Sequence, residues 1–442
     1  MIRSIGGLGR LWGVAAGLAP RPQWNGKCAM KKKFVILHLS DAHIGKSFEG
    51  VDEAEVLDPL YIDIAAVHKD QKLTPDLVVF SGDVVQGCFP ACEHRWCLKD
   101  QVGADCVLEK QYKRADAFVK KVLLSAGGKL GKTPFVIVPG NHDVNRNLVS
   151  GSQRAARKAY DASLVDEIQT NRNNDWPEII KRHKRWFQFA RGLRNARGIH
   201  WDERFCTPWA IIKHGGTSIG VVGFNTSWCA CEKDQLQLWI GDHQFKSLYQ
   251  KVKGAEVKIV VAHHPCTWLN GREAVEKSHK VESSFNIFFH GHEHSGWFSD
   301  GAGHLRVEGG AAYAHSKDRN AYSWVEVDFE TRSARIYART FSNEGRGGWI
   351  PANVPDKIIN GIGEVRALFV NGGKGTPARR RGRGSGAKMR AVARRTGWVP
   401  GSTLSLIDKL AQDYKVRWER QLYDDARKKQ VFWPVRLRLN AF

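Results

Sequence analysis

Residues 34–43 read FVILHLSDAH, a mostly apolar run that ends in an aspartate and a histidine. The apolar part has the length of a buried strand, and Asp and His are residue types that bind metal ions. Four later segments repeat this design: LVVFSGD (77–83), FVIVPGNHD (135–143), KIVVAHHP (258–265) and NIFFHGHEH (286–294). Five strand-like runs that all end in such residues predict one shared pocket, because sites in open α/β sheets assemble at the carboxyl ends of the strands.

Between residues 34 and 340 these short apolar runs alternate with longer segments of helical periodicity, which predicts an α/β fold. We expect strands at Phe34–Leu39, Leu77–Ser81, Phe135–Val138, Ser218–Phe224, Val257–Ala262, Phe285–Phe289, Ser323–Phe329 and Ala334–Arg339. The clearest expected helices are Leu108–Leu124, Gln153–Ile168 and Pro177–Leu193.

The order of the motifs resembles that of the calcineurin-like metallophosphoesterase superfamily over residues 33 to 300. The motifs are Asp41-x-His43, Gly82-Asp83, Gly140-Asn141-His142-Asp143, His263-x-Pro265 and Gly291-His292-x-His294. The resemblance implies an αββα sandwich of two mixed sheets flanked by helices, here with a basic C-terminal extension.

The same resemblance implies a centre of two divalent metal ions, Mn, Fe or Zn. Asp41, His43, Asp83 and His294 would hold one ion, and Asp83, Asn141, His263 and His292 the other, with Asp83 bridging. His264 would be adjacent to the centre without binding metal. His142 would have the catalytic role of stabilising the transition state or protonating the leaving oxygen.

The implied function is the metal-dependent hydrolysis of phosphodiester or phosphomonoester bonds in nucleotides or other small molecules. Two ions neutralise the anionic phosphoester and activate water. In the protein phosphatase branch the motif of Asp83 continues into a second Asp and an Arg, whereas here Val84-Val85-Gln86-Gly87 follows. The His-x-His ending and residues 139–145 look more like bacterial cyclic-nucleotide-type phosphodiesterases.

Two other functions are consistent with the sequence. One is a DNA or RNA nuclease of the same superfamily, and the other is a non-catalytic binding scaffold on this fold. All seven ligand positions and His142 are present, which disfavours the scaffold. Asn225 and Arg146 could point toward the pocket or form turns, and Tyr313 and Tyr322 flank a loop that could cover it.

The charge of the chain is +23, and residues 361–442 carry 19 Lys and Arg against 6 Asp and Glu, a net +13. Residues 371–390 are rich in Gly and Arg, which predicts a flexible linker that could contact nucleic acid or serve only as a tether. Residues 1–29 lack acids and include the apolar stretch Leu11–Ala19, which favours a disordered or mis-assigned leader, with a secretory or organellar targeting segment as the alternative. We expect residues 1–30 to be that leader, 31–351 the catalytic domain, and 352–442 a basic linker with a short helical tail.

No apolar run in the sequence approaches the roughly 20 residues that cross a bilayer, so we expect no membrane partner. The chain has nine cysteines, and Cys88, Cys92, Cys97 and Cys106 cluster with His94. Their spacing lacks a tight CxxC pair, so we favour reduced cysteines over a structural zinc site there. Reduced cysteines in turn predict a cytoplasmic location.

Overall fold

The computed structural model describes residues 33–368 except 46–51, 88–106, 173, 194–195, 197, 302, 315–319, 345–346, 354–357, 359–360 and 366–367. The chain divides into two compact units, Met1–Gly373 and Lys374–Phe442, and every described residue belongs to the first. The expectations for the leader, the Cys88–Cys106 segment, the arginine-rich linker and the helical tail lie outside the described residues.

The first sheet contains seven described strands in the order β13-β12-β11-β1-β2-β3, with β14 also paired to β12. Their bounds are β1 (Lys33–Leu39), β2 (Leu77–Phe80), β3 (Phe135–Ile137), β11 (Ala321–Asp328), β12 (Ser333–Ser342), β13 (Gly348–Pro351) and β14 (Ile362–Val365). Strands β1, β2 and β3 are parallel, and the remaining pairings are antiparallel.

The second sheet also contains seven described strands, in the order β4-β5-β6-β7-β8-β10-β9. They are β4 (Ile199–Asp202), β5 (Thr207–His214), β6 (Thr217–Gly223), β7 (Val257–Val261), β8 (Ile287–His290), β9 (Phe298–Gly301) and β10 (His304–Glu308). Strands β6, β7, β8 and β10 are parallel, and β4, β5 and β9 join by antiparallel pairing. Both sheets are mixed, which confirms the expected fold class.

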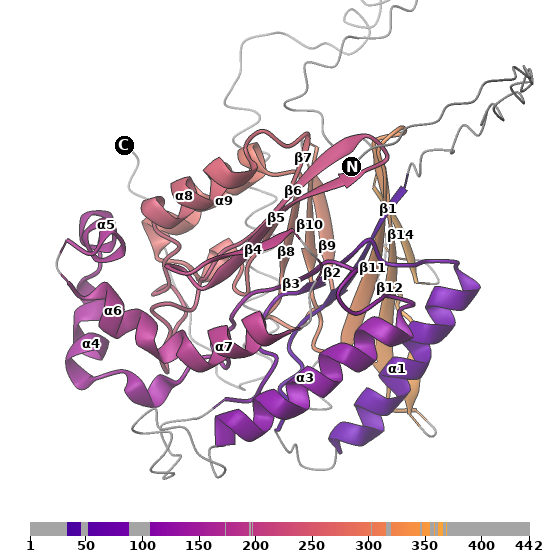
Figure 1. Cartoon of the computed structure of the whole chain (residues 1–442), viewed down its shortest axis with the longest axis horizontal. Helices are drawn as coiled ribbons and strands as arrows, with labels where there is room; N and C mark the ends of the chain where they lie inside the picture. The colour runs from indigo at the N-terminus through magenta and orange to yellow at the C-terminus, as the bar shows by residue number, and fades with distance from the viewer. Residues whose placement is uncertain are drawn as a thin grey trace, which may run out of the picture. The chain divides into compact units, whose positions relative to one another are not determined.

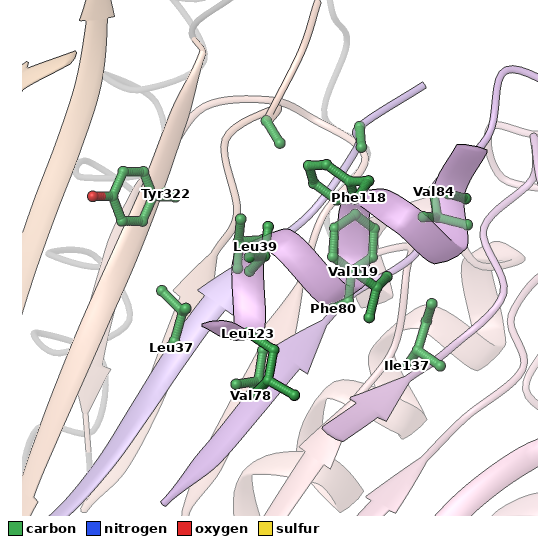
Figure 2. Close-up of a cluster of buried hydrophobic side chains, with 14 of the residues drawn as sticks. Leu37, Leu39, Val78, Phe80, Val84, Phe118, Val119, Leu123, Ile137 and Tyr322 are labelled. Atoms are coloured by element: carbon green, nitrogen blue, oxygen red, sulfur yellow. The ribbon is translucent and has the colours of Figure 1, made fainter. Parts of the chain in front are cut away.

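Strand β1 is buried on both faces, which explains its nearly continuous apolar sequence. Phe34 and Ile36 belong to the core between the sheets, together with Ile259 of β7 and Phe289 of β8. The alternate residues of β1, among them Leu37, belong to the core under the helices. Figure 2 shows this second core, where Phe118, Val119 and Leu123 lie against Leu39, Val78 and Phe80.

Helices cover the outer face of each sheet (Figure 1). Helices α1 (Glu53–Asp70) and α3 (Val107–Ser125) lie side by side over the first sheet. Helices α8 (Asp242–Val252) and α9 (Gly271–Ser284) lie over the second. The sequence therefore folds into four layers, with the two sheets inside.

The expected helix Gln153–Ile168 is wrong as one continuous element, because it is interrupted. Helix α4 (Gly151–Ala156) is followed by a 3-10 turn, and Tyr160 is extended at ψ 126°. Asp161 then caps helix α5 (Ala162–Thr170) by accepting a hydrogen bond from Leu164 N. Similarly, the expected helix Pro177–Leu193 consists of α6 (Trp176–Ile180), a 3-10 turn and α7 (Lys184–Gly192).

The first sheet continues past residue 351, where we placed the end of the catalytic domain. Strand β14 pairs with β12 beyond that residue, and Ile358 and Leu368 are buried in the core between the sheets. A fragment that retains the whole sheet together with this core therefore has to extend at least to Leu368. Within the described residues, no helix combines the length and apolar character needed to cross a membrane.

Candidate metal centre

The predicted site residues lie just beyond the carboxyl ends of parallel strands from both sheets. In the first sheet, Asp41 and His43 follow β1, Asp83 follows β2, and Asn141 and His142 follow β3. In the second sheet, His263 follows β7, and His292 and His294 follow β8. The structure brings all eight side chains together at one edge of the sandwich, as the contacts below show.

Five of these residues have a left-handed backbone, which side chains other than glycine rarely adopt. The φ angles are 52° for Asp41, 43° for His43, 55° for Asp83, 74° for His292 and 52° for His294. Among the described non-glycine residues only six others have positive φ. Such strain persists where the surroundings enforce it, and it concentrates at functional sites.

The side chain of Asp143 holds the two loops that carry Asp83 and Asn141. Its carboxylate accepts hydrogen bonds from the backbone N–H groups of Asp83, Val84, Val85 and Gly140, at 2.7 to 3.2 Å. The sequence alone does not predict this role of Asp143. Asp143 is buried directly after Asn141 and His142. Its hydrogen bonds hold the ends of β2 and β3 in place, and the residues near it supply the candidate metal ligands.

Two glycines allow these loops to approach each other closely. A Cβ atom at Gly140 would lie 2.0 Å from Asp83 Oδ1, and one at Gly291 would lie 1.9 Å from Ser40 Oγ. Neither separation is sterically possible, so the glycine before Asn141 and the glycine before His292 are requirements of the packing.

A first cluster of donor atoms contains Asp41, His43 and His294. His294 Nε2 lies 3.1 Å from Asp41 Oδ1, and His43 Nε2 lies 3.8 Å from the same oxygen. The two Nε2 atoms are 3.5 Å apart. One carboxylate and two imidazoles at this separation could hold a divalent cation.

A second cluster surrounds His263 Nε2. Asp83 Oδ2 lies 3.1 Å away, Asn141 Oδ1 3.0 Å and His292 Nδ1 3.2 Å. Asp83 also belongs to donor groups with Asp41 and with His43, so its carboxylate lies between the two clusters. This is the position in which the resemblance places a bridging ligand.

The second cluster fits a cation because lone pairs face one another within it. His263 Nδ1 lies 2.8 Å from the carbonyl oxygen of Ser81, which can only accept, so Nδ1 carries the proton. In the neutral ring Nε2 then has a lone pair, and it faces a carboxylate oxygen of Asp83. Only a positive charge between these atoms makes the arrangement favourable, and the charge can be a proton or a metal ion.

Electrostatics at the site favour bound positive charge. Burial alone would lower the pKa of His263, but the carboxylates of Asp83 and Asp41 outweigh it and raise the pKa to about 9. Burial would raise the pKa of Asp83, yet His263 and His142 hold it well below its usual value. For His292 burial lowers the pKa to about 3, which leaves this imidazole neutral and able to donate a lone pair.

His142 is held by two backbone contacts. Its Nδ1 donates to the carbonyl oxygen of Gln86 at 2.9 Å, and its own backbone N–H donates to Asp83 Oδ1 at 2.7 Å. The sequence lacks the aspartate that would orient this histidine in protein phosphatases, and the Gln86 carbonyl supplies that contact here. His142 Nε2 lies 4.0 Å from Asp83 Oδ2, and geometrically His142 could also join a donor group with His43.

His264 lies beside the second cluster. Its Nδ1 is 2.8 Å from Thr226 Oγ1, while its buried Nε2 has no hydrogen-bond partner among the described residues. His264 forms a further donor group with His263 and His292. His263, rather than His264, makes the contact with Asp83.

The structure shows the contacts or burial of four residues outside the motifs. Arg146 Nε donates to the carbonyl oxygen of Asn141 at 2.8 Å, so Arg146 supports that loop. Asn225 has a turn role, because its side chain bonds to backbone groups of Phe205 and Ser227. Tyr322 is buried and donates to Asp63, and Tyr313 is buried as well. The loop between them, which could cover the pocket, includes residues 315–319, which lie outside the described residues.

Comparison with known proteins agrees with the fold and with the motif order. Residues 34–296, more than half of the chain, match the model of the calcineurin-like phosphoesterases. The chain therefore belongs to the calcineurin-like phosphoesterase family. No curated protein matches the sequence.

Several solved structures are similar in fold at low sequence identity. A putative 5'-nucleotidase from Staphylococcus aureus is 12% identical with a TM-score of 0.38, over 76% of this chain and 54% of that one. This chain thus spans about half the length of that protein. The Plasmodium inner membrane complex anchor GAP50 has 12% identity and a TM-score of 0.38, with 76% and 89% coverage. Vps29 from Cryptosporidium parvum has 9% identity and a TM-score of 0.32, with 76% and 100% coverage.

Proposed function

We propose that the chain is a hydrolase of phosphodiester or phosphomonoester bonds in nucleotides or other small molecules, dependent on two divalent ions such as Mn, Fe or Zn. The observation that carries the proposal is the pair of donor clusters that meet at Asp83. Asp41, His43 and His294 would hold one ion, His263, Asn141 and His292 the other, and Asp83 both. Bound ions would neutralise the phosphoester and activate water for attack.

His142 is the catalytic residue in this proposal. Because its Nδ1 proton is bonded to Gln86, we assign the acid–base role to Nε2. Burial lowers the pKa of His142, so the free protein has a neutral ring at pH 7. An anionic phosphoester beside the ring would favour its protonated form. Protonated Nε2 could then stabilise negative charge on the phosphoryl group or donate a proton to the leaving oxygen.

A substrate panel with added Mn²⁺ tests the proposal. It compares bis-p-nitrophenyl phosphate, p-nitrophenyl phosphate, cyclic nucleotides, and single- and double-stranded DNA. We expect turnover of the small phosphoesters. Turnover of DNA alone would instead establish the nuclease alternative, and no turnover of any substrate with metal bound would establish a binding scaffold.

Asp83→Asn should remove nearly all of this activity and lower the metal content, because one carboxylate serves both clusters. The control is Asp58→Asn, since Asp58 lies on α1 with a side chain that is 66% exposed. Metal content is measured by elemental analysis. Near-normal turnover of Asp83→Asn with two ions still bound would contradict the assignment.

A further inference from the structure

Trp268 lies next to the second donor cluster. It ends the 3-10 turn Cys266–Trp268, five residues after His263. Its ring centroid is 4.0 Å from that of His292, with the two rings perpendicular. The rings of His263 and His264 also pack around His292, at 5.1 and 4.4 Å. Trp268 is half-buried, whereas His263 and His264 are fully buried. Trp268 is thus the most exposed of the three rings around His292.

The indole of Trp268 is fixed by its one polar atom. Nε1 donates to Glu293 Oε1 at 3.0 Å, and Glu293 stands between His292 and His294 in the chain. Because indole has no other polar atom, the surface of the ring that remains exposed is hydrocarbon. An anchored aromatic surface therefore borders a site whose other groups are carboxylates, imidazoles and an amide.

Part of Trp268 has an ordinary packing role, since the residue contacts the core beneath α8 and α9. That core does not account for the exposed part of the ring, or for the hydrogen bond that holds it against the ligand residues. Ligand sites commonly combine a few convergent polar groups with an apolar or aromatic wall. A planar ring of a bound substrate would cover the indole, and aromatic stacking of nucleobases tolerates any base.

We propose that Trp268 is a specificity-determining residue that stacks on a planar aromatic group of the substrate, and that the substrates are accordingly nucleoside phosphoesters. This inference rests on the proposed function of the metal centre. In a nucleotide a single ribose joins base and phosphate. A phosphate at the donor clusters thus leaves the base near the residues that border them, and Trp268 borders His292.

The test compares two ligands that differ only by the base, adenosine 5'-monophosphate and ribose 5-phosphate. Isothermal titration calorimetry gives the affinity of each ligand for the full chain with Mn²⁺, carrying His142→Ala so that the ligands are hydrolysed roughly 10²–10⁴-fold more slowly during the measurement. We expect the protein to bind the nucleotide about tenfold more tightly than the sugar phosphate, the scale of one stacked base. Trp268→Leu should lose this preference without changing the affinity for ribose 5-phosphate, and Trp268→Phe should keep most of it.

Trp209→Leu is the matched control, because Trp209 is a half-buried tryptophan stacked on His200, with centroids 4.4 Å apart, in the second sheet. It should leave both affinities unchanged. The inference is overturned if the His142→Ala protein shows no preference, if adding Trp268→Leu to it keeps the preference, or if that substitution weakens the binding of both ligands equally. Absence of hydrolysis in the substrate panel would overturn the proposed function alone, since this measurement records binding.

Discussion

At the scale of single residues, His142 is the histidine of the site to which we assign catalysis, and two hydrogen bonds that involve backbone groups hold it in place. The Gln86 carbonyl fixes its ring, and its own N–H bonds to Asp83. We expect His142→Ala to leave the metal content almost intact and to reduce turnover by roughly 10²–10⁴-fold, the usual cost of losing an acid–base group. Turnover of bis-p-nitrophenyl phosphate and metal content are measured on the same preparation.

The control for this variant is His279→Ala, an exposed histidine on α9. His279→Ala should change neither the turnover of bis-p-nitrophenyl phosphate nor the metal content. Loss of an ion from His142→Ala would show that His142 is itself a ligand, as its donor group with His43 and Asp83 allows.

The position of the candidate site could be predicted from the sequence, because each of its residues lies within five residues of the end of a buried strand. The residues that hold them could not. Asp143 acts through four backbone N–H groups from two loops, and Gln86 acts through its carbonyl, so neither contact depends on a recognisable side-chain pattern. The left-handed backbone of Asp41 and His294 could not be predicted from the sequence either, because neither residue is a glycine.

At the scale of elements, α9 contains a buried carboxyl group that makes the stability of the fold depend on pH. Glu273 is 3% exposed and accepts a hydrogen bond from Gly241 N, just before α8. Burial raises the pKa of Glu273 from 4.5 to about 7, although Lys277 opposes the shift. Between these values the folded protein holds a proton that the unfolded chain has released, so this group's contribution to stability falls as pH rises.

We therefore expect Glu273→Gln to be more stable than the unmodified protein at pH 7 and above, by about 3 kcal/mol for this shift. The difference in the free energy of unfolding should decrease as the pH falls from 7 to 4.5, and it should vanish below pH 4.5. Urea unfolding at several pH values measures it. Glu282→Gln, an exposed position on the same helix, is the control. A variant that is less stable than the original at pH 7 would show that the ionised carboxylate is favoured instead.

The elements themselves were predictable where burial was complete. Strands such as β1, β2 and β7 were expected within one residue of their observed ends, because burial on both faces makes their sequences almost entirely apolar. Strand β5 was missed because its later half alternates exposed and half-buried residues. The break between α4 and α5 was missed as well, although Asp161 is a residue type that commonly caps helices.

At the scale of the whole molecule, the extent of the first sheet decides which fragments fold. A fragment of residues 30–373 keeps β14 together with Ile358 and Leu368, whereas one that ends at residue 351 loses this part of the core. We expect the longer fragment to be soluble and to hydrolyse small phosphoesters like the full chain. The shorter fragment should unfold at a lower denaturant concentration.

The longer fragment also lacks most of the basic C-terminal residues. If the full chain binds DNA, its affinity and the salt dependence of that affinity should both fall in this fragment, because fewer phosphates are neutralised. Filter binding at several salt concentrations measures this. An inactive 30–373 fragment would place an essential part of the catalytic fold after residue 373.

The site draws its donors from both sheets. Asp41, His43, Asp83 and Asn141 extend from the first, and His263, His292 and His294 from the second. An ion bound by residues of both sheets would link the two sheets at one edge, because separating the sheets would also break the metal–ligand bonds. Part of the free energy of metal binding would then oppose separation of the two sheets. Under a force that pulls the two sheets apart, the metal-loaded edge would be the last to open, and chelation would remove that resistance.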